Sequence, residues 1–158
     1  MPPQKNHGDG PVKTLLQKQF VINALPQRVW DLLGRTVYGC LPLEQVQIMN
    51  ERTASGLLRW RFAFFNFPLN LKIELIDISP SKLLGTKIWV KAGVFQIAMV
   101  ITFVLSPAKG NKTELICTAM SNEKGTIYKW ILERRQRVFT ENIFNSIGAR
   151  FKQLLDSP

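Results

Sequence analysis

The sequence predicts an α+β domain in which a curved antiparallel sheet of about seven strands surrounds a long C-terminal helix, with a short helix after the first strand. Two observations carry this prediction. Apolar and polar residues alternate through much of the chain, which is the period of a strand with one buried face. After Phe139 the apolar spacing changes to three and four residues, which is the period of a helix. Short turn sequences between the alternating segments favour an antiparallel meander.

The size and composition of the chain fit one globular domain. The chain has 158 residues, of which 46% are hydrophobic and 20% charged, enough to bury a core. Residues 1–11 are polar and rich in Pro and Gly, so we expect a flexible tail before a single domain at 12–156. No apolar signal core follows this tail, and we expect a cytoplasmic location, with a peripheral membrane position as an option.

The most apolar segment, GVFQIAMVITFVLS at 93–106, is shorter than the roughly 20 residues that a membrane-spanning helix needs. Its large side chains fall at odd positions and its smaller or polar ones at even positions, so we expect a strand. Val94, Ala98, Val100 and Val104 on the even face are apolar for a surface that should meet water. They indicate an outer face that is covered or self-associating.

Other stretches alternate in the same way, starting near Leu16, Leu58, Leu69 and Lys87, and more weakly around Leu115. Lys18 is an exception, because it falls on the apolar side of the first strand. Turns are expected at TASG (53–56), NFP (66–68), SPSK (79–82), AG (92–93) and SPAKGNK (106–112).

A short helix is expected at LPQRVWDLL, where Pro26 suits the first helical position and Val29, Leu32 and Leu33 face inward. The inward stripe of the long helix comprises Phe139, Ile143, Phe144, Ile147, Phe151, Leu154 and Leu155. The preceding segment, TIYKWILERRQRV, is also compatible with a helix, but its apolar residues lie on a nearly opposite stripe. Either the helix bends near 134–138, or its first turns contact something other than the sheet.

This order of elements resembles the helix-grip fold of the START and birch-pollen-allergen-like (SRPBCC) superfamily. The residues that carry the resemblance are FVINALPQRVWDLL, a Gly39–Cys40 turn followed by EQVQI, FPLNLKIELIDISPSK, and FNSIGARFKQLL. They are similar to the carbon monoxide dehydrogenase CoxG branch and to its polyketide cyclase and coenzyme Q-binding relatives, over nearly the whole chain from Val12. The resemblance implies an apolar cavity between sheet and last helix, and a role beside a molybdenum hydroxylase or at a membrane.

One departure from that branch concerns the cavity mouth. Its members carry a longer second short helix, whereas here only DLLGRTVY separates Trp30 from Gly39. The resemblance places this element at the mouth of the cavity. Its shortening implies a wider or differently gated entrance.

The sequence contains few residues that could form a catalytic site. His7 is the only histidine and lies in the tail, so neither a nucleophile–base pair nor a histidine-built metal site has a fixed position. Glycine motifs for phosphate or dinucleotide binding are absent. Cys40 and Cys117 are expected to be buried free thiols. Glu74 lies near Asp77, but it falls on the face of its strand that is expected to meet water. We expect no catalytic residue, no metal and no cofactor.

The large apolar residues on one sheet face are the main positive signal. They form either a packed core or the wall of a cavity that binds a hydrophobic ligand, such as a lipid or isoprenoid quinone. Two tyrosines in this set could hydrogen-bond the ligand, or lie at an interface with water. A cyclase- or hydratase-like enzyme using the same pocket is the alternative. The candidate lining is Trp60, Phe62, Phe64, Phe95, Ile97, Met99, Ile101, Phe103, Tyr38, Tyr128, Ile143 and Ile147.

The net charge of +10 indicates attraction to an anionic partner. In YKWILERRQRV, a cluster suited to an anionic membrane surface, or to a solvated turn, comprises Trp130, Arg134, Arg135 and Arg137. A nucleic-acid or protein-interaction surface is a further alternative, because basic residues share the outer sheet face with Trp89: Arg59, Arg61, Lys72, Lys87 and Lys91. No RNA-binding motif accompanies them, so a nucleic-acid partner is not expected.

Overall fold

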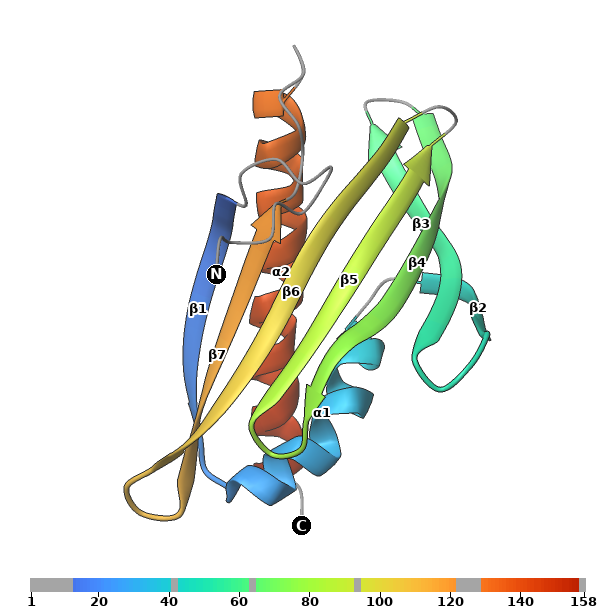
Figure 1. The fold of residues 1–158 in the computed structure, drawn as a ribbon. Coiled ribbons are helices and arrows are strands. Elements are labelled where there is room, and N and C mark those ends of the chain that lie inside the picture. The colour runs from blue at the N-terminus through green and yellow to red at the C-terminus, as the bar shows by residue number, and fades with distance from the viewer. Residues whose placement is uncertain (1–12, 41–42, 63–64, 93–94, 122–128, 157–158) are drawn as a thin grey trace, which may run out of the picture.

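The computed structural model describes residues 13–40, 43–62, 65–92, 95–121 and 129–156. In chain order the elements are β1 (Lys13–Ile22), α1 (Pro26–Cys40), β2 (Leu43–Ile48), β3 (Thr53–Phe62), β4 (Phe65–Ser79), β5 (Leu83–Ala92), β6 (Phe95–Ala108), β7 (Lys112–Ser121) and α2 (Lys129–Asp156). The strands form one antiparallel sheet in the order β1-β7-β6-β5-β4-β3-β2. The sheet is curved, and both helices lie on the same face (Figure 1). This is the α+β helix-grip-like fold that the sequence predicts; the predicted tail at 1–11 lies outside the described residues.

The inner face of the sheet is built from rows of side chains that the strand register sets side by side. Across β4, β5 and β6 these rows are Ile78–Leu84–Phe103, Leu75–Thr86–Ile101 and Ile73–Ile88–Met99. Neighbouring rows are roughly 6.7 Å apart, because every second residue of a strand faces the same side. The sequence correctly predicts which alternate residues of these strands face the core, since Ile73, Ile88 and the odd positions of β6 from Met99 to Leu105 are buried.

The sheet-facing stripe of α2 is also confirmed. Ile143, Phe144, Ile147 and Phe151 are buried, whereas Val138 is exposed. The helix runs from Lys129 to Asp156 as one element. Two polar residues, Gln136 and Thr140, extend the buried stripe toward the N-terminus of the helix, and the apolar pattern alone does not reveal them.

Lys18 shows why a charged residue is tolerated on the inner side of β1. Its Nζ donates a hydrogen bond to Asn145 Oδ1 at 2.7 Å and lies 3.6 Å from Glu141 Oε1. Both partners belong to α2, so this contact joins the edge of the sheet to the helix. The charge stays partly in water, and the bridge contributes about 1 kcal/mol or less.

Two of the predicted turns are wrong. The TASG segment forms the start of β3, where Ala54 is buried; the turn lies just before it, with the Met49 N–H donating to the Thr53 carbonyl at 2.9 Å. The NFP segment lies within β4. Proline is tolerated there because the register between β4 and β5 begins only at the Asn70–Lys91 pair.

The remaining predicted turns separate strands as expected. Lys82 N–H donates to the Ser79 carbonyl at 3.0 Å between β4 and β5. Gly110 and Asn111 take positive φ angles of 78° and 57° between β6 and β7. These are residue types that adopt the left-handed region most readily. β5 ends at Ala92 of the AG pair, and its glycine lies outside the described residues.

Helix α1 is longer than predicted. It starts at Pro26 as expected, with Val29 and Leu33 buried, but it continues through Thr36 to Cys40. The predicted Gly39–Cys40 turn is therefore wrong, because these residues are the last of the helix. The Thr36 hydroxyl donates to the Leu32 carbonyl at 2.7 Å, which satisfies a buried polar group within the helix.

The edge strand β2 is short and irregular. It pairs with β3 through a register shift between Glu44 and Gln47, and Gln45 takes a positive φ of 52°. At the opposite edge, β1 has a register shift between Thr14 and Leu16. Neither edge is therefore a straight, regular ladder.

Gly148 lets α2 approach β1 closely. A Cβ atom at this position would lie 2.5 Å from Phe20 Cε1 and 3.0 Å from its Cδ1. We expect Gly148→Ala to lower the free energy of unfolding by about 1–3 kcal/mol, because the aromatic ring must move. Urea denaturation measures this change.

The control is Gly34→Ala on α1, where an added Cβ meets no atom within 4 Å. Alanine is the better helix former, so this change should leave stability equal or raise it by up to about 1 kcal/mol. Equal stabilities for the two variants would contradict the close approach at Phe20.

Candidate functional site

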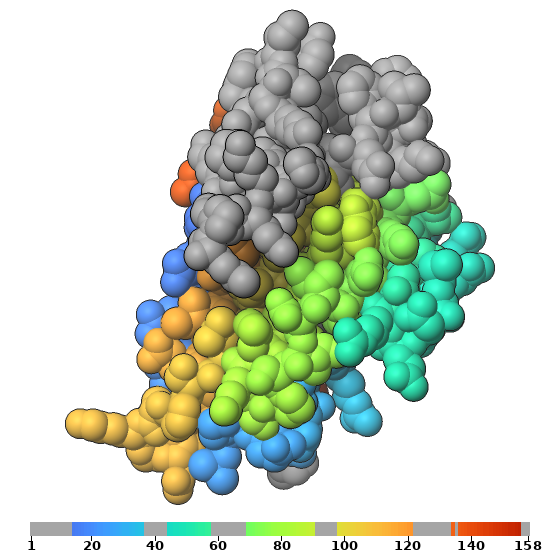
Figure 2. Space-filling model, in the orientation of Figure 1, coloured from blue at the N-terminus to red at the C-terminus, as the bar shows by residue number. Residues whose placement is uncertain are grey.

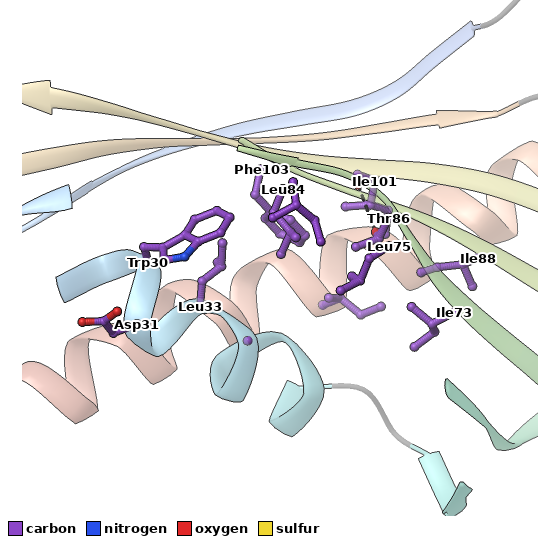
Figure 3. A pocket seen from close by; sticks show the side chains of 13 residues that line it. Trp30, Asp31, Leu33, Ile73, Leu75, Leu84, Thr86, Ile88, Ile101 and Phe103 are labelled. Atoms are coloured by element: carbon purple, nitrogen blue, oxygen red, sulfur yellow. Dashed lines mark hydrogen bonds between the residues drawn. The ribbon is translucent and has the colours of Figure 1, made fainter. Parts of the chain in front are cut away.

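An apolar cavity of about 350 Å³ lies between the inner sheet face, α1 and α2. This volume falls within the range of roughly 300–1,000 Å³ that ligand pockets occupy. In Figure 3, Trp30 and Leu33 lie on the α1 side, facing Phe103 and Leu84 of the sheet. The lining residues are Trp30, Asp31, Leu33, Gly34, Ile73, Leu75, Ile78, Leu84, Thr86, Ile88, Ile101, Phe103 and Ile143.

Three elements position these side chains. The three sheet rows form one wall, because their inward positions repeat every second residue. Helix α1 contributes Trp30, Leu33 and Gly34, whose spacing of three and four residues places them on one face. Ile143 closes the cavity from α2. Gly34 carries no side chain, and the space beside it is open.

The polar groups of this cavity are few, and two of them are bonded within the protein. The Thr86 hydroxyl donates to the Ile101 carbonyl at 3.0 Å within the sheet. Asp31 is exposed, and its Oδ1 accepts a hydrogen bond from Gln27 Nε2 at 2.9 Å. The cavity therefore offers burial of apolar surface as its main source of binding energy.

The structure brings together part of the predicted lining. Ile101, Phe103 and Ile143 line the cavity, while Met99 and Ile147 are buried in the adjoining core. The other predicted lining residues have side chains outside the described set, and their role stays a prediction: Tyr38, Trp60, Phe62, Phe64, Phe95, Ile97 and Tyr128.

The α1 wall of the cavity was not predicted as a site. Trp30 and Gly34 do not belong to the apolar stripe that the sequence predicts for this helix. Each of them directly follows a residue that does, Val29 and Leu33. Leu84 and Thr86 occupy even positions of β5, as Ile88 does. The alternation of this strand could therefore have assigned them to the same inner face of the sheet.

Two findings concern the titratable groups of the described chain. Cys117 is a buried free thiol, as predicted, and burial raises its pKa to about 12. It therefore stays protonated at neutral pH and is a poor nucleophile. The side chain of Cys40 lies outside the described set. Within the described ranges, no three His, Cys, Asp or Glu side chains gather where they could hold a metal ion.

A second, shallower depression lies on the outer face of the sheet. Its volume is about 470 Å³, and it is lined by Gln45, Gln47, Ser55, Gly56, Leu57, Asn70, Leu71, Lys72 and Trp89. The Nζ atoms of Lys72 and Lys87 lie 5.2 Å and 5.0 Å from the centre of the Trp89 ring. The predicted grouping of these lysines with Trp89 is confirmed. Figure 2 shows this face, which lies opposite the helices.

The side chains of Arg59, Arg61 and Lys91 lie outside the described set, so their part in this outer surface stays a prediction. On β6, Ala98 and Val100 are half-buried and Val104 is exposed. The predicted apolar outer face of this strand is thus partly accessible.

The predicted membrane surface falls on the first turns of α2. Arg134 and Arg137 are exposed there, and the side chains of Trp130 and Arg135 lie outside the described set. Among the described helices, none combines the length and apolar character that crossing a bilayer requires. Docking on an anionic membrane stays a prediction.

Comparison with known proteins adds evidence on the fold. No protein-family model matches the chain, and no curated protein matches it. A conserved protein from Geobacillus kaustophilus matches with a TM-score of 0.68 and 15% identity, over 87% of this chain and 94% of that one. The Zhui aromatase/cyclase from Streptomyces sp. R1128 matches with a TM-score of 0.63 and 12% identity, over 93% and 98% of the two chains.

A third solved structure, an uncharacterized protein from Rhizobium leguminosarum, matches with a TM-score of 0.61 and 15% identity, over 90% and 96% of the two chains. At these identities the likeness concerns the fold alone. It supports the helix-grip-like architecture and does not single out the CoxG branch.

Proposed function

We propose that the protein binds and carries a hydrophobic small molecule in the cavity between α1, α2 and the inner sheet face. The cavity of about 350 Å³, which is lined mainly by apolar side chains, is the observation that supports this most. A ligand that buries 150 Å² of apolar surface there gains about 4 kcal/mol at ~25 cal/mol per Å², before the costs of association.

The natural ligand should be found with the protein. Native mass spectrometry of protein purified from cells is expected to show an additional apolar mass, which solvent extraction then identifies. Protein that is uniformly free of ligand, and that also fails to bind the small apolar probe described next, would contradict the proposal.

Two tryptophans distinguish the two candidate cavities. Trp30 lines the inner cavity, and Trp89 lines the outer depression. Equilibrium dialysis should show saturable binding of 2-ethylnaphthalene by the wild type, with the dissociation constant unchanged in Trp89→Ala. Trp30→Ala should weaken this binding by about tenfold, because the cavity loses a large apolar part of its wall. Weakening in Trp89→Ala instead would move binding to the outer face.

A cyclase-like enzyme that uses the same cavity is the second candidate, favoured by the structural likeness to an aromatase/cyclase. The described interior offers little acid–base chemistry, because the Thr86 proton is bonded to a backbone carbonyl and Asp31 lies exposed. Turnover that is lost in Tyr38→Phe or Tyr128→Phe, while 2-ethylnaphthalene still binds, would favour the enzyme over the carrier.

A further inference from the structure

The described part of the chain contains one buried side chain whose polar atoms lack a hydrogen-bond partner, and it is Gln136 on α2. Its side chain is 94% buried, since Gln136 is 6% exposed. Neither Nε2 nor Oε1 meets a donor or acceptor. A buried amide in this state weakens the fold, because it loses its hydrogen bonds to water and gains none. Such a group in a folded protein calls for an explanation, and a ligand that pairs with it is one.

Gln136 lies on the face of α2 that forms the cavity wall. Thr140 and Ile143 follow it by four and seven residues, which places the three on one side of the helix. Ile143 lines the cavity, and Thr140 is fully buried. Seven residues correspond to roughly 10 Å along the helix axis. Gln136 is therefore two turns beyond the cavity-lining part of α2.

Thr140 connects Gln136 to the sheet row at the end of the cavity. Thr140 Oγ1 donates to the Gln136 carbonyl at 2.7 Å and lies 3.3 Å from Met99 Sδ. Met99 stands in register with Ile88, and Ile88 with Ile73, and these two isoleucines line the cavity. Gln136 thus lies about one helical turn past the last row of the cavity wall.

We propose that Gln136 binds the polar end of the ligand. The ligand is then an elongated, uncharged molecule that carries a carbonyl, hydroxyl or amide group at one end. Its apolar body occupies the cavity between Trp30 and the row formed by Ile73 and Ile88, and its polar end reaches the amide. This inference rests on the proposed carrier function.

The chemistry of the amide sets the class of ligand. A glutamine side chain both donates and accepts hydrogen bonds, so it pairs with carbonyl and hydroxyl groups. It carries no charge, and within the described cavity no basic side chain lines the wall. A carboxylate or phosphate buried there would lack a countercharge, so anionic ends are disfavoured. The span from the Phe103 row to the Met99 row is roughly 13 Å, and Gln136 lies beyond it, so the ligand is at least this long.

A matched pair of probes tests the role of Gln136. The two probes are 2-tridecanone and 2-methyl-1-tridecene, which are elongated, have nearly the same shape, and carry a C=O or a C=CH2 group at the same position near one end. Equilibrium dialysis with the full chain is expected to show that the wild type binds the ketone about tenfold more tightly, which is the scale of one added hydrogen bond to an unpaired buried group. In Gln136→Leu this preference should disappear, with the hydrocarbon bound at least as tightly as by the wild type.

Thr140→Val is the control, because it removes a buried hydroxyl one turn away that is already bonded to the helix backbone. It should retain the preference for the ketone. Should Gln136→Leu fail to fold, Gln136→Met is used in its place. Equal binding of both probes by the wild type, or a preference that survives in Gln136→Leu, overturns the role of Gln136 and leaves the carrier function standing. Failure of both probes to bind overturns the carrier function, and the inference with it.

Discussion

Gly34→Trp is expected to weaken the binding of 2-ethylnaphthalene by roughly 50-fold or more while the protein stays folded. Gly34 lines the cavity beside Trp30, and an added Cβ meets no atom within 4 Å. The new side chain leans toward the N-terminal end of α1, and therefore toward Trp30 four residues earlier. An indole ring there would cover on the order of 100 Å² of the apolar surface that the ligand otherwise uses, worth about 2.5 kcal/mol.

Arg35→Trp is the matched control for this prediction. Arg35 is exposed on the same helix and is not part of the cavity lining. The same large side chain at this neighbouring position should leave the dissociation constant within about twofold of the wild type, because surface substitutions away from the site act weakly. Equal weakening in both variants would show that the cavity is not where the probe binds.

Phe144→Ala is expected to lower the free energy of unfolding by about 3–5 kcal/mol, the largest stability effect that we predict. Phe144 is fully buried on α2, and its ring meets that of Phe103 edge-on, with centroids 6.4 Å apart and planes at 69°. Removal of the ring leaves a void that the sheet and the helix cannot both close. Urea unfolding measures the loss, and each kcal/mol should lower the melting temperature by about 2–4 °C.

Val138→Ala serves as its control, since Val138 lies on the same helix with 52% of its surface exposed. That change should alter stability by about 0.5 kcal/mol or less. A loss under about 1 kcal/mol in Phe144→Ala would indicate that the contact between α2 and Phe103 can repack around the void.

The strand pattern of this chain could be predicted because burial on one face leaves a period of two in the sequence. Ile101, Phe103 and Ile143 were assigned to the correct surface from that pattern and from the helical stripe. The turns at 53–56 and 66–68 were not predicted correctly, because small residues and proline serve there as strand positions. Local propensity favours a turn at such sequences, and strand pairing overrides it.

The cavity is harder to predict from the sequence than the strands are. Its α1 wall depends on Gly34, and a missing side chain gives no hydrophobic pattern. Gln136 is hidden for the opposite reason, because a polar residue on a helix is expected to face water. Both residues are recognised only when the packing of α1 and α2 on the sheet is known.

The irregular edges of the sheet have a consequence for assembly. A straight, unpaired edge strand is a template onto which another chain can add a strand, which leads to aggregation. Here β2 is six residues long, shifts register and contains a left-handed Gln45, so it offers no continuous row of backbone groups. The broken edge at β2 therefore lowers the tendency of separate copies of the chain to join through their sheets.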